Sequence, residues 1–124
     1  MKFMVITKGK ESNAVPPPAL IEAIEQLAEE GMKSGELVAR GGLMPSAQGT
    51  RVRLSGGQLD VKDGPFTEAK EIIGGFSINE FESKEKAVEA ALRYMKVAQE
   101  HWPGWEGECE IRPMYGFGVS PGAD

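Results

Sequence analysis

The pattern of apolar and polar positions predicts a strand near the N-terminus, followed by a helix. Residues 2–8 (KFMVITK) form a short run rich in β-branched and aromatic side chains that ends at Gly9, which is typical of a strand. Pro18 suits the first turn of a helix, because its missing N–H needs no partner there. We predict a helix at residues 18–34, closed by Gly35, with an apolar face formed by Leu20, Ile24, Leu27 and Ala28.

The clearest local signal is the segment TRVRLSGGQLDVKDG at residues 50–64. Two runs of alternating apolar and polar residues flank Gly56-Gly57, and a two-residue primed turn needs positive φ at both of its positions. The sequence therefore predicts a β-hairpin. The cross-strand pairs that this register predicts are Val52–Val61, Leu54–Leu59 and Arg53–Asp60.

Two more strands are predicted around this hairpin. Residues 36–43 (ELVARGGL) read as a strand interrupted by Gly41-Gly42. Residues 71–81 (EIIGGFSINEF) alternate well enough for another strand, and Gly74-Gly75 inside it predicts a bulge or a close approach of another backbone. On this strand we expect Ile72, Phe76 and Ile78 to share one side.

A second helix and a last strand complete the pattern. Ser83 is the expected N-cap of the helix, which ends near His101 because the residue before Pro103 avoids the α region. The apolar stripe predicted for this helix comprises Val88, Ala91, Leu92 and Met95. The segment ECEIRPMYGFG that follows predicts a strand with Cys109 and Ile111 on one face, and with Pro113 at an edge or near its end.

The order of elements is β-α-β, a hairpin, then β-α-β. Without the hairpin this is the split βαβ pattern of ferredoxin-like folds. We therefore predict an α+β protein with a ferredoxin-like βαββαβ core and an inserted β-hairpin. Two helices cover only one face of such a sheet, so we expect the second face to meet an identical sheet in a homodimer.

Length and composition fit a single domain without a structural metal or disulfide. The chain has 124 residues, a net charge of −5 and one cysteine, so neither an internal disulfide nor a Cys-rich zinc site is expected. Nucleic-acid binding needs clustered excess Lys and Arg and is not supported. We see neither a signal peptide nor an apolar run of about 20 residues, so we expect a cytoplasmic protein that does not bind membranes.

The segment DGPFTEAKEIIGGF at residues 63–76 combines turn residues, charges and a Gly-Gly step. Placed after a hairpin and before a core strand, it resembles the signature of the DGPF branch of the YCII-related proteins, and the order of elements agrees over roughly residues 1–115. The resemblance implies that residues 1–124 are one YCII-like domain with a flexible tail at residues 116–124. The matching positions are Asp63, Gly64, Pro65, Phe66, Glu68, Lys70, Glu71, Gly74, Gly75 and Phe76.

The resemblance also implies a dimeric α+β barrel, but it does not carry an activity over to this chain. Some relatives are associated with sigma-factor-like regulators. A different branch includes a dehydrochlorinase of chlorinated aromatic hydroquinones, with a proposed His–Asp dyad on the first helix and near the second strand. Here residues 18–34 contain no histidine and residues 35–43 contain no aspartate, so that dyad is absent.

The polar residues of this motif are the candidate site, and two interpretations stay open. In the first, the protein is an enzyme without a cofactor or metal, in which Asp63 is the acid or base for a small molecule. Its candidate substrate-binding residues are Glu68, Lys70, Glu71 and Arg40. In the second, the protein is a non-catalytic dimeric module that binds a small ligand or a regulatory partner. Asp63 then caps the turn that Pro65 shapes.

Overall fold

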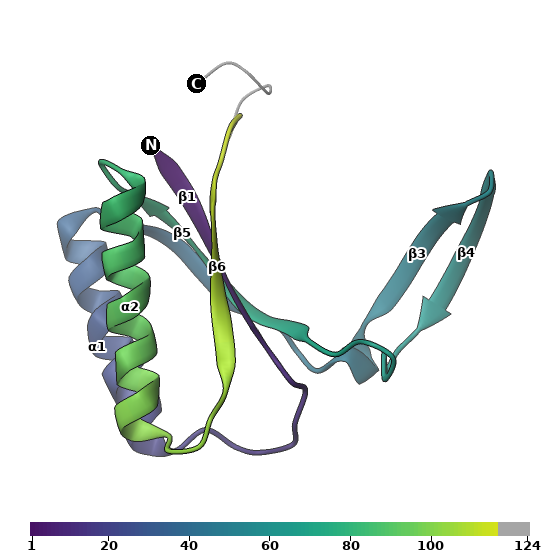
Figure 1. The fold of residues 1–124 in the computed structure, drawn as a ribbon, viewed down its shortest axis with the longest axis horizontal. Helices are drawn as coiled ribbons and strands as arrows, with labels where there is room; N and C mark the ends of the chain where they lie inside the picture. Colours follow the sequence, from purple (N-terminus) through teal and green to yellow (C-terminus); the bar gives the residue numbers. More distant parts are fainter. Residues whose placement is uncertain (117–124) are drawn as a thin grey trace.

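The computed structural model describes residues 1–116, and Figure 1 shows their arrangement. Two helices pack beside a four-stranded sheet, and a two-stranded hairpin extends away from both. The strands of the larger sheet are β1 (Lys2–Gly9), β2 (Leu37–Gly42), β5 (Ile72–Glu80) and β6 (Gly107–Pro113). The hairpin comprises β3 (Thr50–Ser55) and β4 (Gln58–Asp63), and the helices are α1 (Pro18–Ser34), α2 (Lys84–His101) and the short 3-10 helix η1 (Ser46–Gln48).

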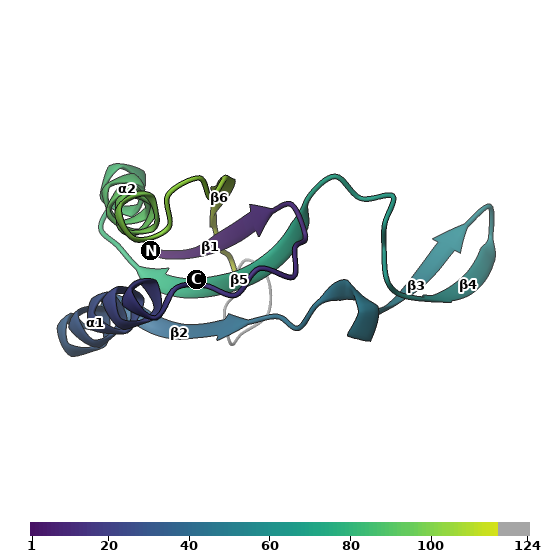
Figure 2. The same ribbon diagram turned by 90° about the horizontal axis from the view of Figure 1, so that it is seen from below.

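The sheet has the strand order β2-β5-β1-β6, and every neighbouring pair is antiparallel. This is the order of a ferredoxin-like sheet with a hairpin inserted between its second and third strands. Both helices lie on the same side of the sheet, as Figure 2 shows. The structure confirms the predicted α+β class with a ferredoxin-like core, whereas the dimer stays a prediction.

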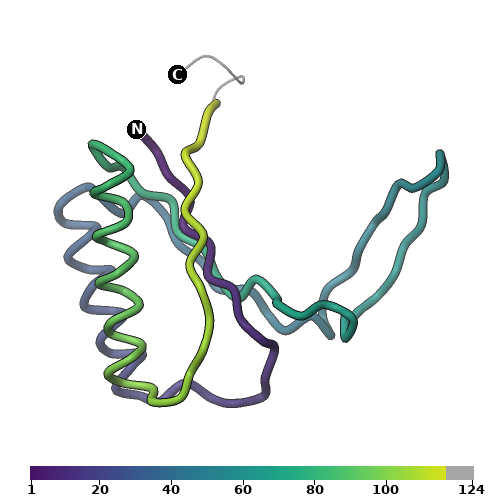
Figure 3. Tube along the Cα trace, in the orientation of Figure 1, coloured from purple at the N-terminus to yellow at the C-terminus, as the bar shows by residue number. Residues whose placement is uncertain are grey.

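The hairpin has the predicted register in full. Gly56 and Gly57 have φ values of 57° and 77°, as a primed turn requires. The pairs Val52–Val61, Leu54–Leu59 and Arg53–Asp60 are all present. The trace in Figure 3 shows that this arm points away from the body formed by the sheet and the helices.

Helix α1 has the predicted bounds. Pro18 is at its first position, and Gly35 closes it in the left-handed conformation with φ of 83°. Leu20 and Ala28 are buried, and Ile24 and Leu27 are half-buried, so the predicted apolar face is confirmed.

Helix α2 begins after the predicted cap, since the Ser83 hydroxyl accepts the N–H of Lys86. Its buried face consists of Ala87, Ala91 and Ala98. The prediction for Leu92 was wrong, because its side chain is 64% exposed. Leu92 lies next to Ala91 in the chain and therefore points about 100° away from it around the helix.

Two glycine segments behave differently from the prediction. Strand β2 continues through Gly41 and Gly42, which still pair with Phe76 and Gly75 of β5, so the predicted interruption was wrong. In β5 the predicted bulge is confirmed: Gly75 pairs with Thr7 and Ile73 with Lys8, which leaves Gly74 as the extra residue.

This bulge changes which β5 side chains share a face. Paired residues of an antiparallel sheet lie on the same face. Ile73 pairs with Lys8 and therefore joins Phe76 and Ile78, while Ile72 pairs with Gly9 on the opposite face. The prediction that Ile72 lies with Phe76 and Ile78 was wrong, because the extra residue shifts the alternation by one.

The last strand agrees with its prediction, since Cys109 and Ile111 pair with Thr7 and Val5 on one face and Pro113 ends the edge strand β6. Most of the predicted tail, residues 117–124, lies outside the described residues. Within residues 1–116 there is no helix with the length and apolar character needed to cross a membrane.

Candidate functional site

The candidate acid Asp63 lies at the end of β4, where the hairpin rejoins the body. Its carboxylate accepts a hydrogen bond from the Thr50 hydroxyl at 3.0 Å, and the two residues face each other across the hairpin. Asp63 is exposed. This hydrogen bond links the last residue of β4 to the first residue of β3.

Of the other charged residues in the motif, Glu68 contacts the hairpin. Glu68 forms an ion pair with Arg51, and its carboxylate is 3.6 Å from the Lys62 ammonium. A hydrogen bond from its own backbone N–H, followed by Arg51, lowers the pKa of Glu68. Lys70 and Glu71 are exposed. The structure therefore joins Glu68 to the hairpin without bringing the four charged motif residues together in one hollow.

The DGPF turn itself packs against the 3-10 helix η1. The peptide bond between Gly64 and Pro65 is cis. The backbone N–H of Phe66 donates to the Ser46 hydroxyl at 3.1 Å, and the Phe66 ring is buried with the Arg51 guanidinium 3.8 Å from its centre. Ser46 also donates to Glu11 through its hydroxyl and, at 2.7 Å, through its backbone N–H. These contacts tie three separate segments of the chain together.

A large hollow lies elsewhere, between the two helices and the sheet. This helix–sheet cavity has a volume of about 940 Å³. Its lining includes short side chains from both sides, Ala28 of α1 and Ala91 of α2 together with Thr7 and Ser77 of the sheet. Small residues on both sides leave volume that a typical close-packed core would fill.

The walls of the helix–sheet cavity are mainly apolar, and its polar groups come from five elements. The apolar lining includes Val5, Ile24, Leu27, Ala28, Leu37 and Ala91. The polar lining includes Thr7, Glu25, Arg40, Ser77, Asn79 and Tyr94. Of the predicted site residues, only Arg40 is among those that line it.

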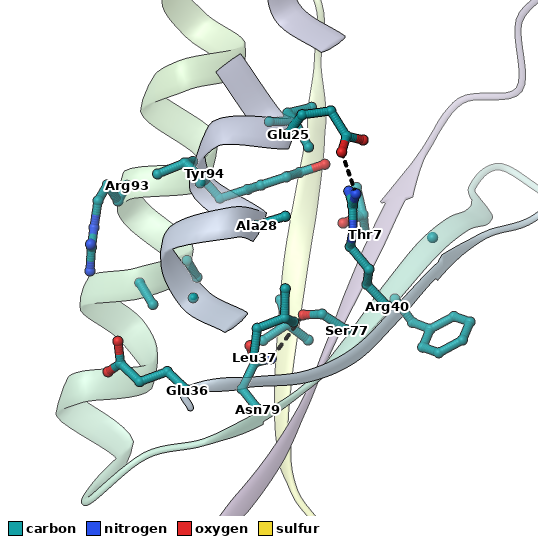
Figure 4. A pocket seen from close by; sticks show the side chains of 18 of the residues that line it. Thr7, Glu25, Ala28, Glu36, Leu37, Arg40, Ser77, Asn79, Arg93 and Tyr94 are labelled. Atoms are coloured by element: carbon teal, nitrogen blue, oxygen red, sulfur yellow. Dashed lines mark hydrogen bonds and ion pairs between the residues drawn. The ribbon is translucent and has the colours of Figure 1, made fainter. Parts of the chain in front are cut away.

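Several polar groups meet at one end of the helix–sheet cavity, as Figure 4 shows. Tyr94 extends from α2 between α1 and the sheet, with its hydroxyl directed toward the end where Thr7 and Arg40 lie. The Arg40 guanidinium forms an ion pair with Glu25, with 2.7 Å between Nη2 and Oε2. Tyr94, Thr7, Arg40 and Glu25 form what we call the polar end of the cavity; Glu36, Asn79 and Arg93 lie elsewhere along its lining, as Figure 4 shows.

A bulge in β2 directs Arg40 toward the helices. Leu37 pairs with Asn79 and Ala39 with Ile78, so Val38 is an extra residue. In a regular strand Leu37 and Arg40 would lie on opposite faces. The extra residue reverses the alternation, and Arg40 pairs with Ser77 on the face that the helices cover.

Burial sets the protonation of two groups near this polar end. It raises the pKa of the Tyr94 phenol, while the Thr7 hydroxyl and the Arg40 charge act in the opposite direction. It also raises the pKa of the Cys109 thiol, whose sulfur is 3.9 Å from the Thr7 hydroxyl oxygen. At neutral pH both groups keep their protons, so Tyr94 offers a hydrogen-bond donor.

Sequence reasoning missed Tyr94 and Glu25 as site residues. Tyr94 occurs three residues after Ala91 on the buried stripe of α2, and that spacing is the signal that places a residue on the same helical face. Glu25 carries no such signal, because it reads as one charge among several on the solvent side of α1. Its role depends on the β2 bulge that brings Arg40 beside it.

The comparison with known families assigns the chain to one of them. Residues 1–103 match the YCII-related domain, and the chain belongs to this family. The match covers both helices and every strand except β6. No curated protein matches the chain significantly. The assignment to the DGPF branch rests on the motif at residues 63–76 and stays a prediction.

The proposed His–Asp dyad of the other branch, expected on the first helix and near the second strand, is replaced here by a different pair of residues. Helix α1 and strand β2 contribute Glu25 and Arg40 to the polar end of the helix–sheet cavity. A carboxylate and a guanidinium form an ion pair, but a guanidinium keeps its proton and is no general base. The residues at this junction therefore differ in chemistry from that dyad.

Proposed function

We propose that this protein binds a small, largely apolar molecule in the helix–sheet cavity. The observation that carries the proposal is the cavity of about 940 Å³, whose apolar walls end at Tyr94, Thr7 and the Arg40–Glu25 pair. Ligand sites of roughly 300–1,000 Å³ with apolar walls and a few convergent polar groups are typical of small-molecule binding. The walls supply affinity and the polar end supplies orientation.

A cavity of this size is more stable with a ligand in it than when it is empty. Protein interiors pack at the density of organic crystals, with few voids larger than a water molecule. Each Å² of apolar ligand surface that enters such a site contributes about 25 cal/mol. A ligand with one or two rings would therefore supply contacts that the alanines of α1 and α2 do not make.

The proposal is tested by titrating the protein with phenylnaphthylamine, an uncharged probe whose fluorescence rises in apolar surroundings. We expect saturable binding with one probe molecule per chain. The Tyr94 and Trp102 side chains line the cavity, so their fluorescence should fall as the probe binds. A linear, unsaturable signal would contradict the proposal.

Acid–base chemistry by Asp63 is a separate hypothesis. Asp63 does not line the helix–sheet cavity, so it would act on a molecule bound at the base of the hairpin. Lys70 and Glu71 follow in the same motif and are exposed, and they would be the partners of such a molecule. If a turnover reaction is identified, loss of kcat/KM in Asp63→Asn would support this role, and an unchanged value would exclude it.

The homodimer is part of the same proposal. The sheet face opposite the helices carries Met4, Ile6, Phe76 and Ile78, and no described element covers it. The hairpin presents four aliphatic side chains on one face, with exposed fractions of 66–76%; they are Val52, Leu54, Leu59 and Val61. A two-fold interface would cover both surfaces with their own counterparts.

A further inference from the structure

We propose that the helix–sheet cavity selects anions: Arg40 binds the negatively charged head group of the ligand, and Glu25 occupies Arg40 until that group displaces it. The inference rests on the proposed binding function and adds the chemical class of the ligand. That class is a small molecule with an aromatic or aliphatic body and one carboxylate or sulfonate group.

The residues at the polar end of the cavity favour a ligand that accepts hydrogen bonds. Arg40 is a permanent cation, and the buried phenol of Tyr94 keeps its proton at neutral pH. Arg40 and Tyr94 are thus two donors in the lining at this end, and a head group that accepts hydrogen bonds suits them.

Arg40 has more hydrogen-bond donors than its pair with Glu25 uses. A guanidinium has five N–H donors in a planar fork, which suits two oxygens of a carboxylate or sulfonate. The hydrogen bond to Glu25 joins a single pair of atoms, Nη2 and Oε2. The arrangement therefore leaves donor positions on Arg40 for a second anion.

Little free energy is lost when Glu25 releases Arg40. The side chains of Arg40 and Glu25 are 39% and 59% exposed, and exposed ion pairs of this kind contribute little to stability. Glu25 returns to water when it releases Arg40, whereas a ligand head group exchanges water for the end of an apolar cavity. Burial of the ligand's apolar body adds affinity that the Glu25 side chain cannot supply.

The cavity lining contains two cations, Arg40 and Arg93. Figure 4 shows Arg93 away from the end where Arg40 and Thr7 lie. The carboxylates of the lining are Glu25, Glu30 and Glu36, and Glu25 is the one that pairs with Arg40. Arg40 is therefore the cation that meets an anion at the polar end, and removal of the Glu25 charge would raise the local affinity for anions.

The experiment compares two probes with similar ring systems: anilinonaphthalene sulfonate, an anion, and uncharged phenylnaphthylamine. Dissociation constants are measured by fluorescence for the wild type, Arg40→Gln, Glu25→Gln and Glu29→Gln. Glu29→Gln is the matched control, because it removes one negative charge from α1 without removing a partner of Arg40. The measurements are repeated in the background Leu54→Ser/Leu59→Ser, which removes the apolar hairpin face as a second site for either probe.

We expect Arg40→Gln to weaken the anionic probe about tenfold, as loss of a hydrogen-bonded charge does. Glu25→Gln should strengthen it about threefold by removing the competing carboxylate. The readout is the ratio of the anionic to the neutral dissociation constant, which cancels any effect that either variant has on the cavity itself, and Glu29→Gln should leave this ratio unchanged. If the neutral probe binds but the anionic probe is insensitive to both Arg40→Gln and Glu25→Gln, the inference is wrong while the proposed binding function stands. If neither probe binds with saturation, the proposed function fails and the inference fails with it.

Discussion

A Cβ atom at Gly64 would lie 1.7 Å from the backbone carbonyl oxygen of Ser46. The DGPF turn and the 3-10 helix η1 are in contact at this point, so only glycine fits. Gly64 also donates its N–H to the Gly49 carbonyl at 2.9 Å. The motif that distinguishes the sequence thus has a clear structural role: it fixes the base of the hairpin to the segment before β3.

Gly64→Ala should lower the free energy of unfolding by about 3 kcal/mol, because the added methyl group meets backbone that has no room to move. Urea unfolding followed by circular dichroism measures the loss. Gly74→Ala is the matched control, since a Cβ there meets no atom within 4 Å and the change should stay within about 0.5 kcal/mol. Equal effects of the two substitutions would contradict this role for Gly64.

Ser46→Ala should lower the free energy of unfolding by about 2 kcal/mol. The Ser46 hydroxyl is buried and bonds both the Phe66 N–H and the Glu11 carboxylate, and a buried donor left without a partner costs about 1–3 kcal/mol. The same substitution at Ser34, an exposed residue, should cost less than about 0.5 kcal/mol. Faster hydrogen exchange at the Phe66 amide in Ser46→Ala would locate the loss. A stability close to that of the wild type would contradict the account.

Tyr94→Phe should make stability less sensitive to alkaline pH. Burial raises the pKa of Tyr94 above the ordinary tyrosine value of 10.0, so the unfolded chain releases the phenol proton first. The Tyr94 contribution is therefore complete below about pH 10 and is lost as the pH rises through the folded pKa. Urea unfolding at pH 8 and pH 11 should show that the free energy of unfolding decreases more for the wild type than for Tyr94→Phe.

Tyr115→Phe serves as the control for that comparison, because Tyr115 is 72% exposed. The free energy of unfolding of Tyr115→Phe should decrease between the two pH values as much as that of the wild type. If Tyr94→Phe behaves like this control, the phenol of Tyr94 is not held in the buried position.

Leu54→Ser/Leu59→Ser should weaken the proposed homodimer at least tenfold. The two leucines form one cross-strand pair with exposed fractions of 70% and 76%, and burial of a leucine contributes about 1.5–3 kcal/mol. Sedimentation equilibrium at micromolar concentration measures the association. Arg53→Ser/Asp60→Ser changes the neighbouring pair on the other hairpin face and should leave the dimer intact. A monomeric wild type, or equal weakening by both double variants, would contradict this interface.

The sequence predicted the elements well and the site less well, for physical reasons. The hairpin register followed from Gly56-Gly57 and strict alternation, and the bounds of α1 followed from Pro18 and Gly35, which are local signals. The bulge at Val38 has no such signal, yet it decides that Arg40 faces the helices. Similarly, the cavity is lined by short residues from four elements, α1, α2, β1 and β5. Neither the bulge nor the cavity can be predicted from one segment of the sequence alone.

The candidate site illustrates the same difference. Asp63, Glu68, Lys70 and Glu71 drew interest because they are neighbours in the chain, whereas the polar end of the cavity gathers residues from α1, α2, β1 and β2. Arg40 is the one predicted binding residue that lies there. Sequence neighbours were a guide to the motif, and only the tertiary structure shows which side chains surround the cavity.

The central claim, that the helix–sheet cavity binds a small apolar molecule, is tested most directly by one pair of variants. Val5 and Ile6 are consecutive in β1, and their side chains lie on opposite faces of the sheet; Val5 lines the cavity. Phenylnaphthylamine affinity is measured for Val5→Trp and Ile6→Trp, with circular dichroism to confirm that both are folded. The account predicts that Val5→Trp fills the cavity and weakens binding at least about tenfold, while Ile6→Trp binds like the wild type. Unchanged binding by folded Val5→Trp would contradict it.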